Sequence, residues 1–170
     1  RGCAELLAAV GVELSVGEVV TSGAQAREVT GRLGSPVAVK ALGSNILHKS
    51  DVGGVILGVR TPLDAARAYE RLLERLGTDL EAALVQPMAG PGEEVIVGAV
   101  RDPAFGAMVL FGAGGTRAEI LADQAFRLTP LCAGDVAEMV ASTRVSRVLT
   151  GWRGSPRLDL AGLDDLVLRV

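Results

Sequence analysis

The stretch Val39-Lys-Ala-Leu-Gly-Ser-Asn-Ile-Leu-His-Lys-Ser-Asp-Val-Gly-Gly54 holds both lysines of the chain and its single histidine. Every other cationic residue is an arginine. Apolar runs lie on both sides of the polar segment, which predicts a strand, a glycine-bearing loop and a second strand. Such a loop suits a polyphosphate, because glycines let backbone N–H groups approach oxygens and Lys40 and Lys49 supply compact charges.

The residues of this loop leave several chemical interpretations open. No Walker A sequence occurs in the chain, and no GxGxxG sequence follows a strand. A generic nucleotide-binding motif is therefore absent. Lys40 could equally be a surface lysine whose stem packs along the strand. His48 could be a general base, a metal ligand or a phosphoryl acceptor. Metal is the weakest of the three, since Asp51 is one neighbouring ligand where catalytic zinc needs about three.

Composition excludes several classes of protein. With 49% hydrophobic residues in 170, the chain can build one good-sized core or two small lobes. A net charge of -3 and only 3% aromatic residues argue against nucleic acid as a partner. No apolar run reaches the ~18 residues of a membrane span, so we expect a soluble, cytoplasmic protein. Cys3 and Cys132 lie far apart, which argues against zinc and disulfides.

The first half of the chain alternates helical and extended patterns. Helices are expected over 4–10, 23–33 and 62–76, and strands over 17–20, 36–41 and 55–60. Ser22 can cap the second helix, which Gly34 would close, and Gly77 would end the third. Within 62–76 we expect one apolar face, with charged residues on the solvent side. The residues assigned to that face are Leu63, Ala66, Leu73 and Leu76.

The second half is richer in strands. Strands are expected over 82–88, 93–100 and 107–111, then two short ones within 116–131, followed by helices over 133–143 and 160–170. Gly112-Ala-Gly-Gly115 is either a second anion cradle or a turn after a buried strand. Glu119, Asp123 and Arg127, on the presumed strands, could line a cleft or a solvated face. The pattern predicts an α+β fold with lobes at 1–80 and 81–170.

Several motifs, in order along nearly the whole chain, resemble one family. It is the ATP-grasp domain of the NDP-forming acyl-CoA synthetases, relatives of the succinyl-CoA synthetase β subunit. The most specific string is His48-Lys-Ser-Asp-Val-Gly-Gly54. The others are Val39-Lys-Ala41, Leu84-Val-Gln-Pro-Met88, Glu94-Val-Ile-Val-Gly98, Arg101-Asp-Pro103, Phe105-Gly106, Phe111-Gly112, Gly114-Gly115 and Phe126-Arg-Leu-Thr-Pro-Leu131. The resemblance implies an ATP-grasp fold, in which two α/β lobes hold ATP or ADP between them.

The resemblance also implies roles for single residues. Lys40 is expected at the nucleotide phosphates, and Glu94 near the ribose. His48 is expected to relay a phosphoryl group between a phosphohistidine of the partner portion and ADP or ATP, with the acidic Glu119 beside it. The segment that meets adenine is expected to consist of Val85, Gln86, Pro87 and Met88. The remaining nucleotide-binding residues implied are Lys49, Gly53, Gly54, Gly114 and Gly115.

Two departures from the family pattern stand out. Gly114-Gly-Thr-Arg-Ala-Glu119 replaces the usual Gly-Gly-Ile-Phe-Val-Glu, so Arg117 places an extra cation near the proposed phosphate path. Full domains of the family continue into two strands that bear an Asn-Pro element and an aspartate for the metal ions, and this sequence stops at Val170. We therefore expect no metal ligand within these residues, Mg²⁺ only in the full-length domain, and no turnover by the fragment alone.

The implied activity is that of an ADP-forming acid–CoA ligase as part of a larger protein. Its reaction interconverts acyl-CoA, ADP and phosphate with acid, CoA and ATP. The implied partner is a CoA-binding domain or subunit, in an oligomeric assembly. The alternative is a non-catalytic, regulatory synthetase-like region fused to a GNAT lysine acetyltransferase. Retention of His48 and Glu119 favours the enzyme over this alternative.

Overall fold

We describe the protein from a computed structural model covering residues 2–34, 36–46, 49–115 and 118–170, with the backbone alone at residues 2–4, 119 and 120. The chain forms two compact units. The N-terminal unit is Ser15–Gly90, and the C-terminal unit joins Arg1–Leu14 to Pro91–Val170. The fold is therefore of the α+β class with two lobes, as the sequence predicts.

The N-terminal unit is built on a four-stranded antiparallel sheet in the order β1-β4-β2-β3. The strands are β1 (Glu18–Val20), β2 (Val37–Leu42), β3 (Val55–Val59) and β4 (Ala82–Pro87). Val39 and Val85 lie opposite each other and are fully buried in the core of this unit. Because side chains alternate along a strand, Lys40 and Gln86 lie on the opposite face of the sheet.

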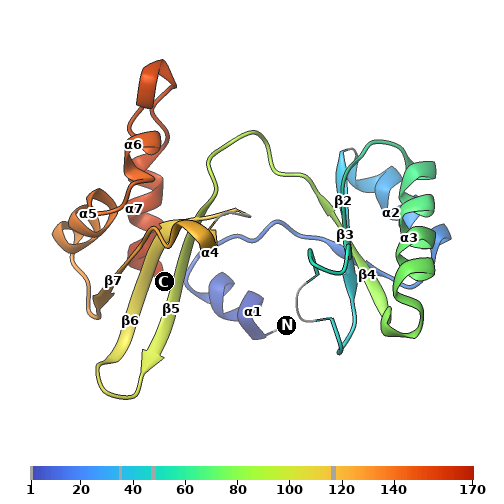
Figure 1. Ribbon diagram of the computed structural model, residues 1–170, viewed down its shortest axis with the longest axis horizontal. Helices are drawn as coiled ribbons and strands as arrows, with labels where there is room; N and C mark the ends of the chain where they lie inside the picture. Colours follow the sequence, from blue (N-terminus) through green and yellow to red (C-terminus); the bar gives the residue numbers. More distant parts are fainter. Residues whose placement is uncertain (1, 35, 47–48, 116–117) are drawn as a thin grey trace. The chain divides into compact units, whose positions relative to one another are not determined.

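Two helices cover the core face of this sheet (Figure 1): α2 (Gly23–Leu33) and α3 (Pro62–Leu76). Ser22 caps α2 by accepting a hydrogen bond from the backbone N–H of Gln25, and Gly34 ends it at φ 77°. Thr61 caps α3 in the same way, and a 3₁₀ turn, η1 (Gly77–Asp79), follows. The predicted ends of both helices are confirmed, because each end is set by a residue with a local backbone role.

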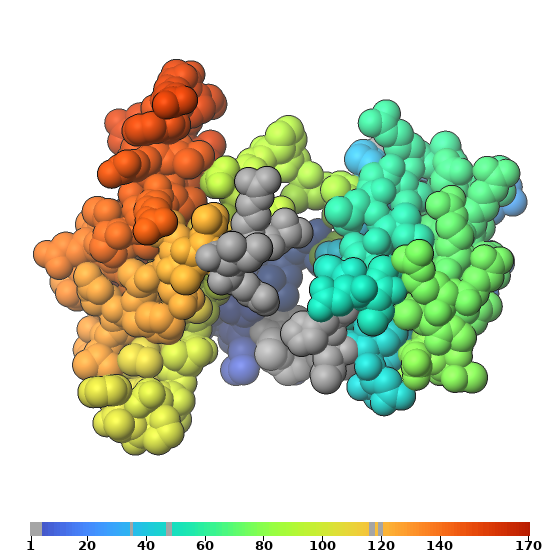
Figure 2. All heavy atoms as spheres, in the orientation of Figure 1, coloured from blue at the N-terminus to red at the C-terminus, as the bar shows by residue number. Residues whose placement is uncertain are grey.

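The buried face of α3 differs from the one the sequence predicts. Leu63 and Leu73 are 50% and 42% exposed, and the buried residues are instead Ala65, Ala68, Tyr69 and Leu72. These four follow the helical spacing i, i+3, i+4, i+7. The prediction was wrong for Leu63 and Leu73, because α3 packs against α2 as well as the sheet and this packing sets which side of the helix is buried. Leu76, partly buried, does pack against the core. The charged residues do lie on the exposed side, on the surface coloured green in Figure 2.

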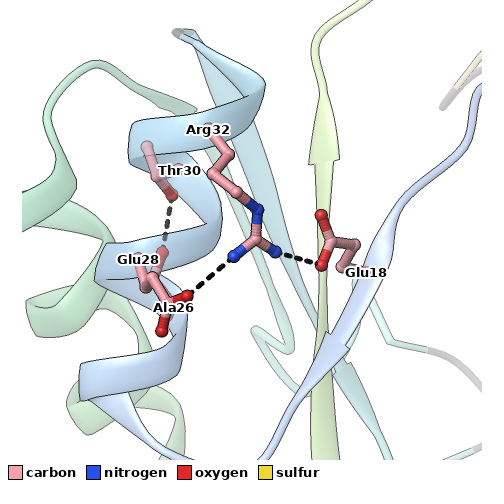
Figure 3. Close-up of polar contacts among 5 residues, drawn as sticks. All are labelled: Glu18, Ala26, Glu28, Thr30 and Arg32. Carbon is pink, nitrogen blue, oxygen red and sulfur yellow. Dashed lines mark hydrogen bonds and ion pairs between the residues drawn. The ribbon is translucent and has the colours of Figure 1, made fainter.

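An arginine links α2 to the first strand of the sheet (Figure 3). The guanidinium of Arg32 contacts a carboxylate oxygen of Glu18 at 2.5 Å and one of Glu28 at 2.8 Å. Inside the same helix the buried hydroxyl of Thr30 donates to the carbonyl of Ala26. Because the Arg32 side chain is 53% exposed, its two ion pairs contribute little to the stability of the unit.

The C-terminal unit has a three-stranded antiparallel sheet, β5-β6-β7, and the helices of residues 133–169 pack on one of its faces (Figure 1). Its core centres on Phe111, Val136 and Met139, all fully buried. The strands are β5 (Val95–Asp102), β6 (Gly106–Ala113) and β7 (Gln124–Leu128). The helices are α1 (Gly2–Ala9), α4 (Ala118–Leu121), α5 (Ala133–Ala141), α6 (Ser146–Leu149) and α7 (Leu160–Arg169), with a 3₁₀ turn, η2 (Trp152–Gly154).

Only one of the two strands expected within 116–131 is present. Residues 118–121 form the short helix α4 instead, and the chain reverses at Ala122, whose φ is 44°, before β7 begins. Ala, Glu and Leu are good helix formers, and this segment pairs with no strand. Its helix propensity therefore explains why it is helical. The sequence also gave no indication of α6, a single helical turn.

The two units do not coincide with the expected lobes 1–80 and 81–170. Strand β4 belongs to the N-terminal unit because it pairs with both β1 and β2, and residues 1–14 are grouped with the C-terminal unit. Both assignments depend on contacts between residues distant in sequence. No helix among the described residues is long and apolar enough to cross a bilayer.

Candidate functional site

Lys40 and Gln86 meet on the solvent-facing side of the N-terminal sheet. Lys40 is paired with Leu84 and Gln86 with Ala38, so the two side chains are diagonal neighbours on one face. The ammonium of Lys40 donates to Oε1 of Gln86 at 2.9 Å. Nε2 of Gln86 in turn donates to the carbonyl of Ser15 at 2.6 Å. The three groups form one chain of hydrogen bonds, part-buried at Lys40 and exposed at Ser15.

The loop between β2 and β3 returns to the sheet through backbone hydrogen bonds. Gly54 donates to the carbonyl of Lys49 at 2.6 Å, and its own carbonyl accepts from Ala41 at 2.7 Å. Gly53 donates to Ser50 at 3.1 Å and has a φ of 65°, which favours glycine. The N–H groups of both glycines therefore have partners inside the protein, in contrast to the expectation that they approach phosphate oxygens.

Carboxylates hold the start of this loop. The hydroxyl and the backbone N–H of Ser44 both donate to Oε1 of Glu81, at 2.6 and 2.8 Å. These two hydrogen bonds, the hydroxyl's first, lower the pKa of Glu81 below its ordinary value. Asn45 donates to a carboxylate oxygen of Asp79 at 3.1 Å. The loop is thus attached to the segment that joins α3 to β4.

An arginine of α3 lies against the other end of the loop. A Cβ at Gly53 would come within 1.8 Å of Nη1 of Arg75, so a larger residue there would displace that guanidinium. Arg71 and Arg75 also line a cavity of about 480 Å³ with Gly53, Ile56 and Glu74. From the sequence, both arginines belong to the charged residues expected on the solvent side of the helix, and their position beside the loop depends on how the helix packs.

The segment expected to meet adenine has two kinds of side chain. Val85 is fully buried in the core, so its side chain cannot contact a ligand. Pro87 is half-buried at the end of β4, and Met88 is 36% exposed, with its backbone N–H bonded to the carbonyl of Pro36. An apolar ligand surface at this segment would therefore come from Pro87 and Met88.

In the C-terminal unit, Glu94 lies against the glycines that follow β6. Gly114 donates to the carbonyl of Glu94 at 2.7 Å, and a Cβ at Gly114 would lie only 2.8 and 2.9 Å from the carbonyl carbon and oxygen of Glu94. Gly115 has a φ of 75°, and its own Cβ would be 3.0 Å from the Glu94 carboxylate. The structure thus brings together three of the predicted nucleotide-binding residues, with the Glu94 carboxylate over a glycine turn.

The carboxylate of Asp123 is engaged in hydrogen bonds to the backbone. Its two carboxylate oxygens accept from the backbone N–H groups of Arg144 and Val145, at 2.7 and 2.8 Å. It also lines a cavity of about 340 Å³ with Ile96, Leu110 and others. Arg127, expected beside it, donates instead to the carbonyl of Phe126.

The two residues expected to be catalytic fall outside this description. His48 is not among the described residues, and only the backbone of Glu119 is described, in α4 rather than in a strand. Among the side chains that the structure describes, no group of three or more His, Cys, Asp or Glu could hold a metal ion. Ser15, which holds Gln86, was missed because a backbone carbonyl leaves no signal in the sequence.

Known sequences show which family this chain matches. Residues 2–170 match the ATP-grasp domain family. The chain is 37% identical to the ADP-forming acetate–CoA ligase I of Archaeoglobus fulgidus, over 97% of this chain and 25% of the ligase. It is 33% identical to the beta subunit of the ADP-forming acetate–CoA ligase I of Pyrococcus furiosus, over 98% of this chain and 74% of the subunit.

Solved structures are similar over the same span. The dinucleotide-forming acetyl-coenzyme A synthetase 1 of Ca. Korarchaeum cryptofilum, in complex with coenzyme A and Ca-AMPCP, has a TM-score of 0.89. It is 32% identical and covers 97% of this chain and 74% of that one. A second structure of that synthetase, with Mg-AMPPCP and a phosphohistidine segment pointing towards the nucleotide binding site, has a TM-score of 0.78 at 33% identity, covering 96% of this chain and 71% of that one.

Proposed function

The chain belongs to the ATP-grasp family, and on this premise we propose that it is the nucleotide-binding part of an ADP-forming acyl-CoA synthetase. The observation that carries the proposal is the similarity to ADP-forming acetate–CoA ligases over 97% and 98% of the chain. The reaction interconverts acyl-CoA, ADP and phosphate with acid, CoA and ATP. Because these relatives are ligases, they favour a synthetase over a regulatory region fused to an acetyltransferase.

Different residues bind the nucleotide and transfer the phosphoryl group. Lys40 and Lys49 supply positive charge for the phosphates, Pro87 and Met88 contact the base, and Glu94 lies near the ribose. His48 accepts the phosphoryl group: its imidazole nitrogen attacks the γ-phosphorus of ATP, the P–O bond to ADP breaks and a P–N bond forms. In the onward transfer, a histidine of the partner portion attacks the same phosphorus, the P–N bond to His48 breaks and a new P–N bond forms on the partner portion. Glu119 is the acidic residue beside the histidine.

The donor set in the structure fits an anionic nucleotide. Lys40 has one hydrogen bond to Gln86, and its ammonium has two further N–H groups available for phosphate oxygens. Gly53, Gly54 and Gly114 shape their turns, since their own N–H groups are engaged within the protein. Mg²⁺ would neutralise phosphate charge when bound, and the full-length domain is proposed to hold it.

The partner of this part is a CoA-binding domain or subunit that carries its own phosphohistidine. The chain spans 25% of the A. fulgidus ligase, which leaves room in such a protein for the CoA chemistry. The P. furiosus relative is a beta subunit, so the partner can also be a separate chain within an oligomer. Since the reaction consumes ATP and CoA, we place the protein in the cytoplasm.

Phosphoryl labelling tests this function. The full-length protein, together with its CoA-binding partner, is incubated with ATP labelled in the γ-phosphate. We expect label on a base-stable, acid-labile nitrogen at His48, and none on this domain in His48→Ala. Asn45→Ala, in the same loop, is the control and should keep the label. Labelling of the domain that persists in His48→Ala would remove the relay role, and an unlabelled wild type would remove the synthetase function.

A further inference from the structure

We propose that Gln86 is a positioning residue, which orients the ammonium of Lys40 toward the nucleotide phosphates instead of reading the adenine base. This inference rests on the proposed function, because it assumes a nucleotide at Lys40. The resemblance groups Gln86 with the residues that meet the base. Its hydrogen bonds indicate a different role, since both polar ends of the side chain are already engaged within the N-terminal unit.

The two hydrogen bonds fix which way the amide points. Oε1 accepts from Lys40 at 2.9 Å, and Nε2 donates to the carbonyl of Ser15 at 2.6 Å. The reverse orientation would place the NH₂ group against an ammonium, which only donates, and the oxygen against a carbonyl, which only accepts. The Ser15 carbonyl therefore selects the orientation of the amide, and the amide presents an acceptor to Lys40.

The Ser15 carbonyl is itself held in place by close packing. A Cβ at Gly17 would lie 2.8 Å from Leu84, 2.9 Å from the Val85 carbonyl and 3.1 Å from Cβ of Gln86. Only glycine lets the chain lie this close to β4. One residue later β1 begins and pairs with β4, Glu18 opposite Val85. The acceptor for Gln86 thus comes from backbone that is anchored to the same strand.

A neutral acceptor suits a phosphate-binding lysine. A freely rotating lysine loses rotamer entropy when it is fixed, and a pre-oriented one loses less on binding. A carboxylate partner would orient the ammonium but would also compete with phosphate for its charge. Among the described residues Lys40 has no ion pair within 4.0 Å, and its hydrogen-bond partner is the uncharged amide. Gln86 therefore orients Lys40 and leaves its charge for the ligand.

The test compares two ligands that differ only in the phosphates. Binding of ATP and of adenosine to the full-length protein is measured by calorimetric titration, with adenosine in competition if its binding is weak. Gln86→Met keeps the length of the side chain and removes both hydrogen bonds. We expect it to weaken ATP binding about tenfold and to leave adenosine binding within about twofold. Equal weakening of the two ligands would mean that Gln86 reads the base and would overturn the proposal.

The matched control is Gln25→Met in the same unit. Oε1 of Gln25 accepts hydrogen bonds from the backbone N–H and the hydroxyl of Thr21, at 2.7 and 3.1 Å, at the start of α2. The substitution removes the same chemical group away from Lys40. Both ligands should bind to it as to the wild type. If Gln25→Met lost as much ATP affinity as Gln86→Met, the effect of Gln86→Met would reflect general destabilisation, and the proposal would fail.

A double-mutant cycle separates this inference from the proposed function. If Gln86 acts through Lys40, Gln86→Met has no further effect on ATP binding in a Lys40→Ala background. If Lys40→Ala itself leaves ATP binding unchanged, the assignment of Lys40 to the phosphates fails. If Lys40→Ala weakens binding and Gln86→Met does not, only the positioning role fails.

Gln86→Glu provides a second variant in case Gln86→Met does not fold. Its carboxylate keeps an acceptor for Lys40 but places an oxygen against the Ser15 carbonyl and a negative charge near the phosphates. We expect a larger loss for ATP than for adenosine, and this difference should shrink as salt screens the charge. Equal losses for both ligands would again count against the proposal.

Discussion

Asp123 is the residue whose role changed most between pattern and structure. Its charge, spaced from Glu119 and Arg127 along presumed strands, suggested a member of a cleft. Both carboxylate oxygens instead accept backbone N–H groups of Arg144 and Val145, 21 and 22 residues further along the chain. The carboxylate thus ties the turn before β7 to the chain that leads into α6.

Removing that carboxylate should destabilise the C-terminal unit. We expect Asp123→Ala to lower the free energy of unfolding by roughly 2–3 kcal/mol, since two backbone donors lose a charged acceptor. Asp123→Asn keeps one acceptor and should lose about half as much. Urea unfolding measures both, with the exposed neighbour variant Gln124→Ala as the control. A cost near zero for Asp123→Ala would mean that the carboxylate is available for a ligand after all.

At the scale of the element, α3 shows that the ends of a helix and its buried face have different causes. Its limits, Pro62 and Leu76, agree with the prediction because Thr61 and Gly77 set them locally. Its buried face was predicted from spacing along the sequence, as Leu63, Ala66, Leu73 and Leu76. The face that packs contains two alanines and Tyr69, because α3 has to approach α2 as well as the sheet.

Two neighbouring leucines of α3 test this correction. Leu72 is 1% exposed and Leu73 is 42% exposed, in the same helix and with the same intrinsic preference. Leu72→Ala should cost about 2–5 kcal/mol in unfolding free energy, whereas Leu73→Ala should cost less than about 1 kcal/mol. Chemical denaturation of the two variants gives the comparison directly. Equal costs would favour the face that the sequence predicted.

At the scale of the whole molecule, the residues that the structure describes form two hydrophobic cores with no residue in common. One gathers Val39, Leu72 and Val85, and the other gathers Phe111, Val136 and Met139. Each core is enclosed by its own sheet and helices. Each unit therefore has its own source of stability, and a truncation in one core removes contacts from that unit alone.

Hydrogen exchange of the backbone amides can detect this separation. Phe111→Ala should lower protection in β5, β6 and α5, by an amount that corresponds to about 3–5 kcal/mol, and leave β2 and β4 close to wild type. Leu72→Ala should do the reverse. Loss of protection throughout the chain in either variant would show that the two units unfold as one.

The sequence by itself determined those features that depend on neighbours along the chain. The caps Ser22 and Thr61, the helix ends at Gly34 and Gly77, and most strands follow from local backbone preference and spacing. The family follows from short strings in a fixed order, above all residues 48–54. The roles proposed for Lys40 and Glu94 rest on the same strings.

Only the tertiary structure decided what depends on residues distant in sequence. The packing of α2 selects the buried face of α3, pairing on both sides places β4 in the N-terminal unit, and Asp123 meets a backbone 21 residues away. Gln86 is the clearest case, because its partners Lys40 and Ser15 lie 46 and 71 residues away. A glutamine has the same chemistry at every position, and the fold alone determines which donor and which acceptor it meets.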